Sequence, residues 1–346
     1  MADVPLPQAV THRPVPEREI TAAVLLTLPD GRLNPEAVGW TRTPLVITDG
    51  VGRGRRAWGR TKRWENWTVT TSTHVVTLSI SDLDYAAVHG IWLLDRRTGV
   101  EIAHDAVGLL GGSATLPGTL GRGAVRARTL AVRIDIDEVE DGTRLRAVGE
   151  RVRVDLFAHR PEGHERLGVV VPWSRRRFVY AVKDVARPAE GTVFVDGHPE
   201  PFATGVSWAT HDHGRGRWPR AVQSLSGTGS GVNDGRAIGF HVGGRWTDGT
   251  GSVENALLVD GRLSKLSEEL AWEYDPEDWM APWRVRGDAV DLTFTPERIR
   301  ASGAEHKAAP SQSNQCFGSW SGHVRDEGGA RVEVADVFGW AQARNP

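Results

Sequence analysis

The chain has 346 residues and a formal net charge of −2, which suggests two domains or one large β-domain and no overall field that would attract nucleic acid or an anionic membrane. Its single cysteine, Cys316, excludes an internal disulfide, and no apolar run approaches the ~18 residues that span a bilayer. The first residues show no basic segment followed by an apolar run, so we expect a cytoplasmic protein without a signal peptide, an integral membrane segment or a nucleic-acid partner. The sequence leaves the oligomeric state open.

Short segments of alternating or apolar residues recur along the chain and predict β-strands. These segments are His74–Ser81, Gly90–Leu94, Thr129–Ile136, Arg151–Phe157, Val169–Pro172, Gly191–Val195, Ala237–Val242, Ala256–Val259, Asp288–Phe294 and Ala330–Val337. Seven Asp-Gly pairs occur along the chain, and this dipeptide favours the tight turns of β-hairpins. Helical periodicity is scarce, although Ser264–Leu270 fits either a short helix or a strand. We predict an all-β fold of consecutive hairpins, arranged as a meander sheet or a closed barrel.

The stretch Pro188–Gly191 is the best candidate for a domain boundary, since about half of the chain lies on each side of it. We therefore predict an N-terminal β-domain over residues 1–190 and a C-terminal β-domain over residues 191–346.

Tryptophan is unusually frequent, with 14 residues against 8 phenylalanines and 3 tyrosines. Such an excess fits a broad β-core or a ligand cavity lined with indoles. In the segment Lys62–Trp67, a Lys-Arg pair stands beside two tryptophans. We interpret Lys62, Arg63, Trp64 and Trp67 as a cationic and aromatic edge of a ligand cavity. The alternative is a surface Lys-Arg pair over two indoles of the core.

The segment His211–Pro219 crowds charged and aromatic residues beside glycines, which lets side chains be aimed inward over a short span. A buried Asp212 needs a cation or hydrogen-bond donors, and Arg215 is an adjacent candidate. We predict a catalytic role for Asp212 and ligand binding by Arg215 and Trp218. A structural ion pair beneath a hairpin remains the alternative.

A second carboxyl group precedes the apolar run Ala256–Val259. If Glu254 points inward beside indoles, it could stay protonated and serve as a general acid. Asn255 is then a candidate to hold a ligand or a water. The alternative is a pair of polar residues at a strand end that bond to neighbouring backbone.

Two further patterns suggest site chemistry without completing it. His211 and His213 would share one face of a strand, as metal ligands often do, but no third ligand stands at a readable spacing. Glu254 or His241 could complete the set only through the fold, which leaves metal binding by the pair open. We assign no metal and give His213 a catalytic role, holding a water. Asp82 and Asp84 could be paired carboxylates for acid–base work, although two aspartates after a strand more often lie in a turn. No motif for a dinucleotide or a nucleoside triphosphate is present, so we predict no organic cofactor.

Motifs along nearly the whole chain together resemble one bacterial family, domain of unknown function 2804. They are G-R-L-N-P-E-A-V-G-W (Gly31–Trp40), K-R-W-x-x-W (Lys62–Trp67), V-V-P-W-S (Val170–Ser174), G-R-G-x-W-P (Gly214–Pro219), E-N-x-x-x-x-D-G (Glu254–Gly261), P-W-R-V (Pro282–Val285), D-L-T-F-x-P (Asp291–Pro296) and Q-C-F-G (Gln315–Gly318). Two positions depart from the family pattern: Gln342 stands where an acidic residue is expected, and Arg220–Gln223 replaces an aromatic-rich run.

The resemblance carries an expectation about architecture. The family is similar in organisation to tandem lipocalin-like proteins, among them the carotenoid 1,2-hydratases and the fungal kievitone hydratase. It therefore implies two lipocalin-like antiparallel β-barrels or half-barrels packed side by side, with an apolar, isoprenoid-like or lipid-like small molecule as the partner. Fold similarity alone does not establish an activity.

Two functions follow as hypotheses. The first is a cofactor-independent hydratase, isomerase or cyclase, in which a buried carboxylic acid (Asp212 or Glu254) protonates an alkene and indoles stabilise the cation. The second is a carrier or lipid-binding protein that uses the same cavity without chemistry.

Overall fold

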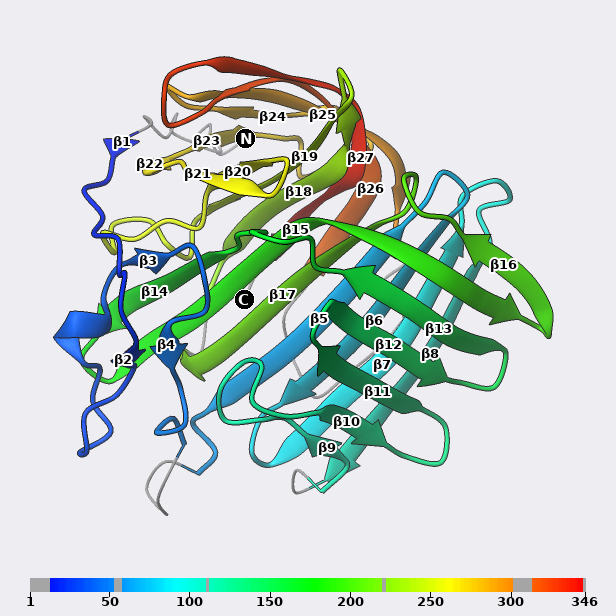
Figure 1. The fold of residues 1–346 in the computed structure, drawn as a ribbon, viewed down its shortest axis with the longest axis horizontal. Helices are drawn as coiled ribbons and strands as arrows, with labels where there is room; N and C mark the ends of the chain where they lie inside the picture. Colours follow the sequence, from blue (N-terminus) through cyan, green and yellow to red (C-terminus); the bar gives the residue numbers. More distant parts are fainter. Residues whose placement is uncertain (1–12, 53–57, 110–111, 220–221, 301–312, 345–346) are drawn as a thin grey trace, which may run out of the picture.

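The computed structural model describes residues 13–52, 58–109, 112–219, 222–300 and 313–344 (Figure 1). It is 61% strand and 1% helix, and it consists of a nearly closed barrel and a half-barrel that pack together. The all-β prediction and the paired-barrel architecture are confirmed. The segment Ser264–Leu270, which fitted either a helix or a strand, contains strand residues and no helix.

The barrel is built from a 14-stranded sheet whose main path runs through eleven strands. In spatial order these are β8 (Glu101–Leu109), β7 (Ala86–Asp95), β6 (His74–Asp82), β5 (Lys62–Thr70), β17 (Trp208–Arg217), β15 (Arg177–Val195), β13 (Val152–His159), β12 (Gly142–Val148), β11 (Arg133–Val139), β10 (Val125–Arg128) and β9 (Ala114–Thr115). Off this path, β14 (Leu167–Ser174) pairs with β15 and with β3 (Trp40–Thr41), and β16 (His198–Phe202) pairs with β15.

The half-barrel is a nine-stranded sheet. Its order is β21 (Arg262–Lys265), β20 (Ala256–Val259), β19 (Arg236–Gly244), β18 (Ser224–Asn233), β27 (Arg331–Arg344), β26 (Ser313–Arg325), β25 (Val290–Ile299), β24 (Trp283–Arg286) and β23 (Ala271–Glu273). The remaining elements are the pairs β1 (Arg13–Pro14) with β22 (Glu268–Glu269) and β2 (Val24–Leu25) with β4 (Val46–Ile47), and the 3-10 turn η1 (Pro35–Ala37).

Strand β15 is 19 residues long and takes part in two pairings along one edge. Its first part pairs with β14 and its last part with β13, while β17 lies along the opposite edge. The register with β17 shifts between Asp184 and Arg187, a bulge that bends the strand where it changes partners. The predicted boundary between residues 190 and 191 falls inside this strand. The chain passes from one sheet to the other between β17 and β18, and independent folding of two domains stays a prediction.

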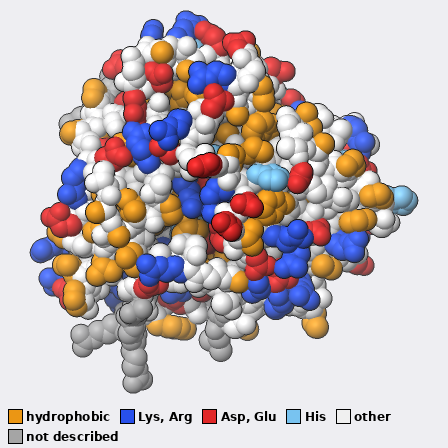
Figure 2. All heavy atoms as spheres, in the orientation of Figure 1, with side chains coloured by type: hydrophobic (Ala, Val, Ile, Leu, Met, Phe, Trp, Pro, Cys, Tyr) orange, Lys and Arg blue, Asp and Glu red, His pale blue; other side chains and the backbone are white. Residues whose placement is uncertain are grey.

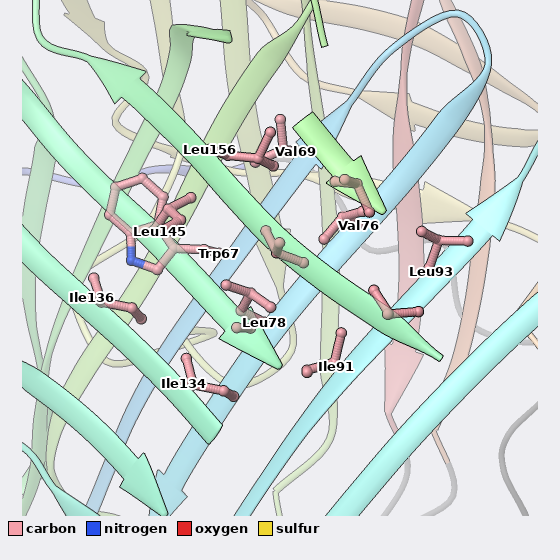
Figure 3. Packing of buried hydrophobic residues seen from close by; sticks show 14 of the residues in the cluster. Trp67, Val69, Val76, Leu78, Ile91, Leu93, Ile134, Ile136, Leu145 and Leu156 are labelled. Atoms are coloured by element: carbon pink, nitrogen blue, oxygen red, sulfur yellow. The ribbon is translucent and has the colours of Figure 1, made fainter. Parts of the chain in front are cut away.

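The interior of the barrel is filled by side chains from opposite walls (Figure 3). Trp67 and Val69 on β5 and Leu78 on β6 face Ile134 and Leu145 from β11 and β12. Alternation places every second residue of each strand inward, so these short apolar–polar patterns form one continuous core. Trp67, predicted to bind a ligand, is 1% exposed and belongs to this core.

The barrel and the half-barrel meet along a surface that we call the seam, where β15 and β17 lie against β18 and β19. Close approach is possible because Gly239 lacks a side chain: a Cβ there would lie 2.7 Å from the Cβ of Ala186. The backbone N–H of Ala186 donates to Ser230 Oγ across the seam at 3.0 Å. Charged side chains of both signs are interspersed over the face of the molecule shown in Figure 2. No helix of the described residues is long and apolar enough to cross a membrane.

Candidate functional site

The sequence-predicted site residues lie on opposite faces of β5 and β17. In the antiparallel register, His213 stands opposite Glu65, and Asp212 stands opposite Asn66. Since neighbouring residues of a strand point to opposite faces, Asp212 faces the seam while His213 faces the barrel interior. Arg215 also faces the interior, so the expected pairing of Asp212 with Arg215 is wrong.

The seam site is centred on Lys183 of β15, whose ammonium group bridges two carboxylates. Lys183 Nζ lies 2.9 Å from Asp212 Oδ2 and 3.2 Å from Glu254 Oε2. Asp212 belongs to the barrel, whereas Glu254 precedes β20 of the half-barrel, so the ion network crosses the seam. The Glu254 side chain is 2% exposed, while that of Asp212 is 33% exposed. Asp212 is therefore the carboxylate of this network that a ligand can reach from solvent.

Indole N–H groups complete the coordination of both carboxylates. Trp64 Nε1 donates to Asp212 Oδ1 at 2.9 Å, and Trp246 Nε1 donates to Glu254 Oε1 at 2.6 Å. His241 Nε2 lies 3.4 Å from the same Glu254 oxygen. These donors favour the ionised form of the buried carboxylate.

The electrostatics of Glu254 contradict its predicted role as a general acid. Burial alone would raise its pKa, but the charge of Lys183, together with His241 and the Trp246 N–H, lowers the pKa of Glu254 to about 2. Burial would likewise lower the pKa of Lys183, yet Asp212 and Glu254 raise it above its ordinary value. Glu254 is thus a carboxylate and Lys183 an ammonium group at neutral pH.

An aromatic surface adjoins Asp212. The rings of Trp64 and Trp218 stack with centroids 4.5 Å apart, and the Lys62 ammonium lies 4.7 Å from the Trp218 centroid. Trp64 is 9% exposed, whereas Trp218 is only partly buried. Burial, with Arg344 as the next cause, lowers the pKa of Lys62 to about 8. Lys62 and Trp64 of the predicted cationic and aromatic edge thus lie together with Trp218, while ligand binding there stays a prediction.

The interior face carries a second polar group of residues, which we call the histidine cluster: Glu65, His211, His213 and Arg215. Glu65 lies 2.6 Å from His211 Nε2 and 2.9 Å from His213 Nδ1, and Arg215 donates to it at 2.6 Å. All four side chains are at most 2% exposed. Glu65, His211 and His213 each offer one ligand atom, and these atoms lie within 4.8 Å of one another, so the set could hold a metal ion.

Burial and neighbouring charges shift the pKa values of Glu65 and His213 in the histidine cluster. Burial opposes ionisation of Glu65, but His213 and Arg215 hold its pKa well below the ordinary value. Burial, followed by the positive charge of Arg215, lowers the pKa of His213 to about 4. His213 is therefore a neutral imidazole at neutral pH, and it lies on the face opposite the seam carboxylates.

Two other predicted ligand-binding residues have structural contacts. Arg63 pairs with Asp82, the last residue of β6, at 2.9 Å and with Asp84, in the connection to β7, at 3.3 Å. Asn255 accepts from the Gly243 N–H at 2.6 Å and donates to the Glu268 carbonyl at 2.7 Å. Asn255 is fully buried, and these two backbone bonds match the strand-end alternative.

Sequence reasoning missed three residues of these sites, Lys183, Glu65 and Trp246, and named His241 only as a possible metal ligand. Lys183 carried a usable signal, because it is one of only four lysines and directly follows the run Phe178–Val182. Glu65 lies between Trp64 and Trp67 and was not predicted to belong to a site. His241 and Trp246 reach Glu254 only through the fold. Of the two family departures, Gln342 donates to Ser313 Oγ at 2.5 Å, and Arg220 and Ala221 lie outside the described residues.

A nearly closed barrel and a half-barrel, with polar clusters on both faces of the strands between them, define a tandem lipocalin-like β-protein. Within that class, the chain belongs to the family described as Domain of unknown function (DUF2804), whose model matches residues 17–345. The resemblance read from the motifs is thereby confirmed.

Solved structures are similar in fold at low sequence identity. CghA, in a structure with Sch210972, shares 13% identity with a TM-score of 0.51 over 82% of this chain and 87% of its own. Kievitone hydratase from Nectria haematococca shares 11% identity with a TM-score of 0.49 over 83% of this chain and 88% of its own. A putative AttH from Nitrosomonas europaea shares 10% identity with a TM-score of 0.45 over 84% and 94%. No curated protein matches the chain.

Proposed function

We propose that this protein binds an apolar, unsaturated or aromatic small molecule at the seam site. The observation that carries the proposal is the stacked pair of Trp64 and Trp218 beside a partly exposed Asp212. An indole face attracts planar apolar groups, and a few polar atoms at its border can orient them. Lys62, over the Trp218 ring, adds a cation that can bind a carbonyl or carboxylate oxygen of the ligand.

If the site is catalytic, its chemistry is that of a base. Lys183 and its neighbours lower the pKa of Glu254, so Glu254 loses its support as the acid that protonates an alkene. Asp212 can instead remove a proton from a carbon next to a ligand carbonyl, with the electron pair moving onto the carbonyl oxygen. Return of that proton at another carbon gives an isomerase, and loss of hydroxide gives a hydro-lyase, both without a cofactor.

The carrier function remains the second candidate, and one observation favours it. Both oxygens of Asp212 already accept a hydrogen bond, from Trp64 and from Lys183. A carboxylate held in this way is well suited to a fixed structural role and less suited to taking a proton.

Binding can be tested with Trp218→Leu and Asp212→Asn. Small molecules retained by the purified chain are identified by mass spectrometry, and their affinities are then measured. Trp218→Leu should weaken binding about tenfold, because it removes the ring that stacks on the ligand and that positions the Lys62 ammonium. Each of these interactions contributes about 0.5–2 kcal/mol. Trp92→Phe is the matched control, since Trp92 is buried in a different cluster with Phe317. Equal affinity in wild type and Trp218→Leu would refute the seam site.

The same ligands separate the enzyme from the carrier. The enzyme requires wild-type turnover of an unsaturated carbonyl compound that Asp212→Asn binds but converts at least 100-fold more slowly, in line with the ~10²–10⁴-fold typical of general base catalysis. Asp155→Asn serves as the surface control, because its side chain is 54% exposed. Binding without turnover in the wild type supports the carrier.

A further inference from the structure

We propose that Glu65, His211 and His213 form a binding site for a divalent transition-metal ion inside the barrel. The sequence argued against a metal because the His-x-His pair had no third ligand at a readable spacing. The fold supplies that ligand from β5, whose Glu65 stands opposite His213 in the register. Two imidazoles and one carboxylate are a donor set that divalent first-row metals favour.

The ligand atoms lie close enough together to meet at one ion, all within 4.8 Å of one another. A metal about 2.1 Å from each ligand atom separates neighbouring ligands by about 3.0 Å in an octahedron and about 3.4 Å in a tetrahedron. The Glu65 oxygens lie 2.6 Å from His211 Nε2 and 2.9 Å from His213 Nδ1. Both separations are shorter than either value, so an ion replaces these two hydrogen bonds and spreads the ligand atoms apart by less than about 1 Å.

The surroundings accommodate a cation despite the presence of Arg215. The two nearest guanidinium groups are already paired with carboxylates, Arg215 with Glu65 and Arg63 with Asp82 and Asp84. Arg215 holds Glu65 Oε1 at 2.6 Å and thereby fixes the orientation of the carboxylate. Residues that orient metal ligands in this way commonly contribute to metal affinity.

The protein alone leaves part of the cluster unsatisfied. His211 Nδ1, His213 Nε2 and Arg215 Nε are buried without a hydrogen-bond partner. The two unpartnered ring nitrogens are not the ligand atoms, which contact Glu65, and buried polar atoms of this kind commonly bond to ordered water. An ion held by three protein atoms keeps open positions that water can fill.

The test uses the full-length chain and cobalt as the probe. Because the ligands are at most 2% exposed, the chain is unfolded in denaturant with a chelator and refolded with or without Co²⁺. After gel filtration we expect one cobalt per chain, visible absorption from protein-bound Co²⁺, and a higher melting temperature than that of the metal-free chain. Wild-type protein that refolds without retaining cobalt and melts at the same temperature under both conditions overturns the proposal.

Variants locate the ion. His211→Asn and His213→Gln should each reduce retained cobalt at least tenfold, whereas the control His323→Asn, on β26 of the other sheet, should retain it fully. If either ligand variant fails to fold, the stoichiometry and spectrum of the wild type still decide the matter. Full retention by folded ligand variants would place the ion elsewhere and refute this site. The outcome is independent of the proposed function, because the seam site lies on the opposite face of β17.

Discussion

At the scale of single residues, two glycines explain why charged and aromatic side chains can crowd together at the seam. A Cβ on Gly214 would lie 1.9 Å from Trp64 Cη2, and a Cβ on Gly243 would lie 2.5 Å from Glu254 Oε1. From the sequence, the glycines of His211–Pro219 were interpreted as positions whose backbone freedom lets neighbouring side chains be aimed inward. Gly214 has no positive φ, so its role is to leave space for the Trp64 ring.

Lys62 should be unusually reactive toward amine-directed reagents. Burial lowers its pKa to about 8, so a large fraction of the amine is unprotonated near that pH. We expect acylation of Lys62 by an anhydride to reach half its maximal rate near pH 8, as followed by peptide mass spectrometry. Lys183 and Lys265 serve as internal controls, because both are buried in ion pairs and should react slowly in the folded chain.

Removal of the Trp218 ring should raise the pKa of Lys62, since the ring helps to bury the amine. A rate for Lys62 that keeps rising to about pH 10.5, as for an exposed lysine, would contradict the prediction.

At the scale of elements, strand alternation was sufficient to read part of the site. It correctly placed His211 and His213 on one face, and it also implies that Asp212 and Arg215, three positions apart, face opposite sides. What the sequence could not provide is the pairing of β17 with β5, because these strands are separated by more than a hundred residues. That register brings Glu65 to the histidines and Trp64 to Asp212.

The hairpin turns were the most predictable elements. Asp196-Gly197, Asp234-Gly235 and Asp260-Gly261 connect β15 to β16, β18 to β19 and β20 to β21, and all six residues have positive φ. Asp and Gly tolerate this left-handed conformation, so the dipeptide identifies the turn before any partner strand is known.

The contact between β17 and the Trp64 ring can be tested with Gly214→Ala. The added Cβ cannot fit beside Trp64, so the ring must move away from Asp212 and Trp218. We expect the free energy of unfolding in urea to fall by about 1–3 kcal/mol, with a change in near-UV circular dichroism.

Gly231→Ala is the matched control for this substitution, since Gly231 also lies in a strand and the nearest atom to its added Cβ is 3.5 Å away. Its unfolding free energy should change by no more than about 0.5 kcal/mol. If Gly214→Ala keeps wild-type stability and an unchanged spectrum, the packing of Trp64 across β17 is wrong.

At the scale of the whole molecule, a buried ion network joins the two sheets. Lys183 of the barrel contacts Glu254 of the half-barrel at 3.2 Å, with both side chains largely buried. The sequence predicted two packed β-units from turn spacing and family motifs. It could not predict this contact, because ion pairing across a seam depends on how two complete sheets are oriented.

This network should make stability depend on acid pH. The folded-state pKa of Glu254 is about 2, below its ordinary value of 4.5, so the folded state binds fewer protons there. The stabilisation is therefore present above pH 4.5 and is lost as the pH falls toward 2. We expect Glu254→Gln to lower the free energy of unfolding at pH 7 by about 3 kcal/mol or more, since Lys183 loses one partner.

The variant should also lose less stability than the wild type when urea unfolding is compared at pH 5 and pH 3. Glu273→Gln provides the control, because Glu273 is 60% exposed in a surface pair and should follow the wild type. Parallel loss of stability in wild type and Glu254→Gln would show that Glu254 is not the titrating group.

The place of β17 in the barrel has a consequence for how the chain is made. Strand β17 closes the gap between β5 and β15, yet it is encoded more than 130 residues after β5 begins. During synthesis, one edge of β5 therefore stays unpaired until residue 217 has left the ribosome. An unpaired edge can form hydrogen bonds with a strand of a neighbouring chain. We therefore expect the nascent chain to depend most on chaperones in this interval.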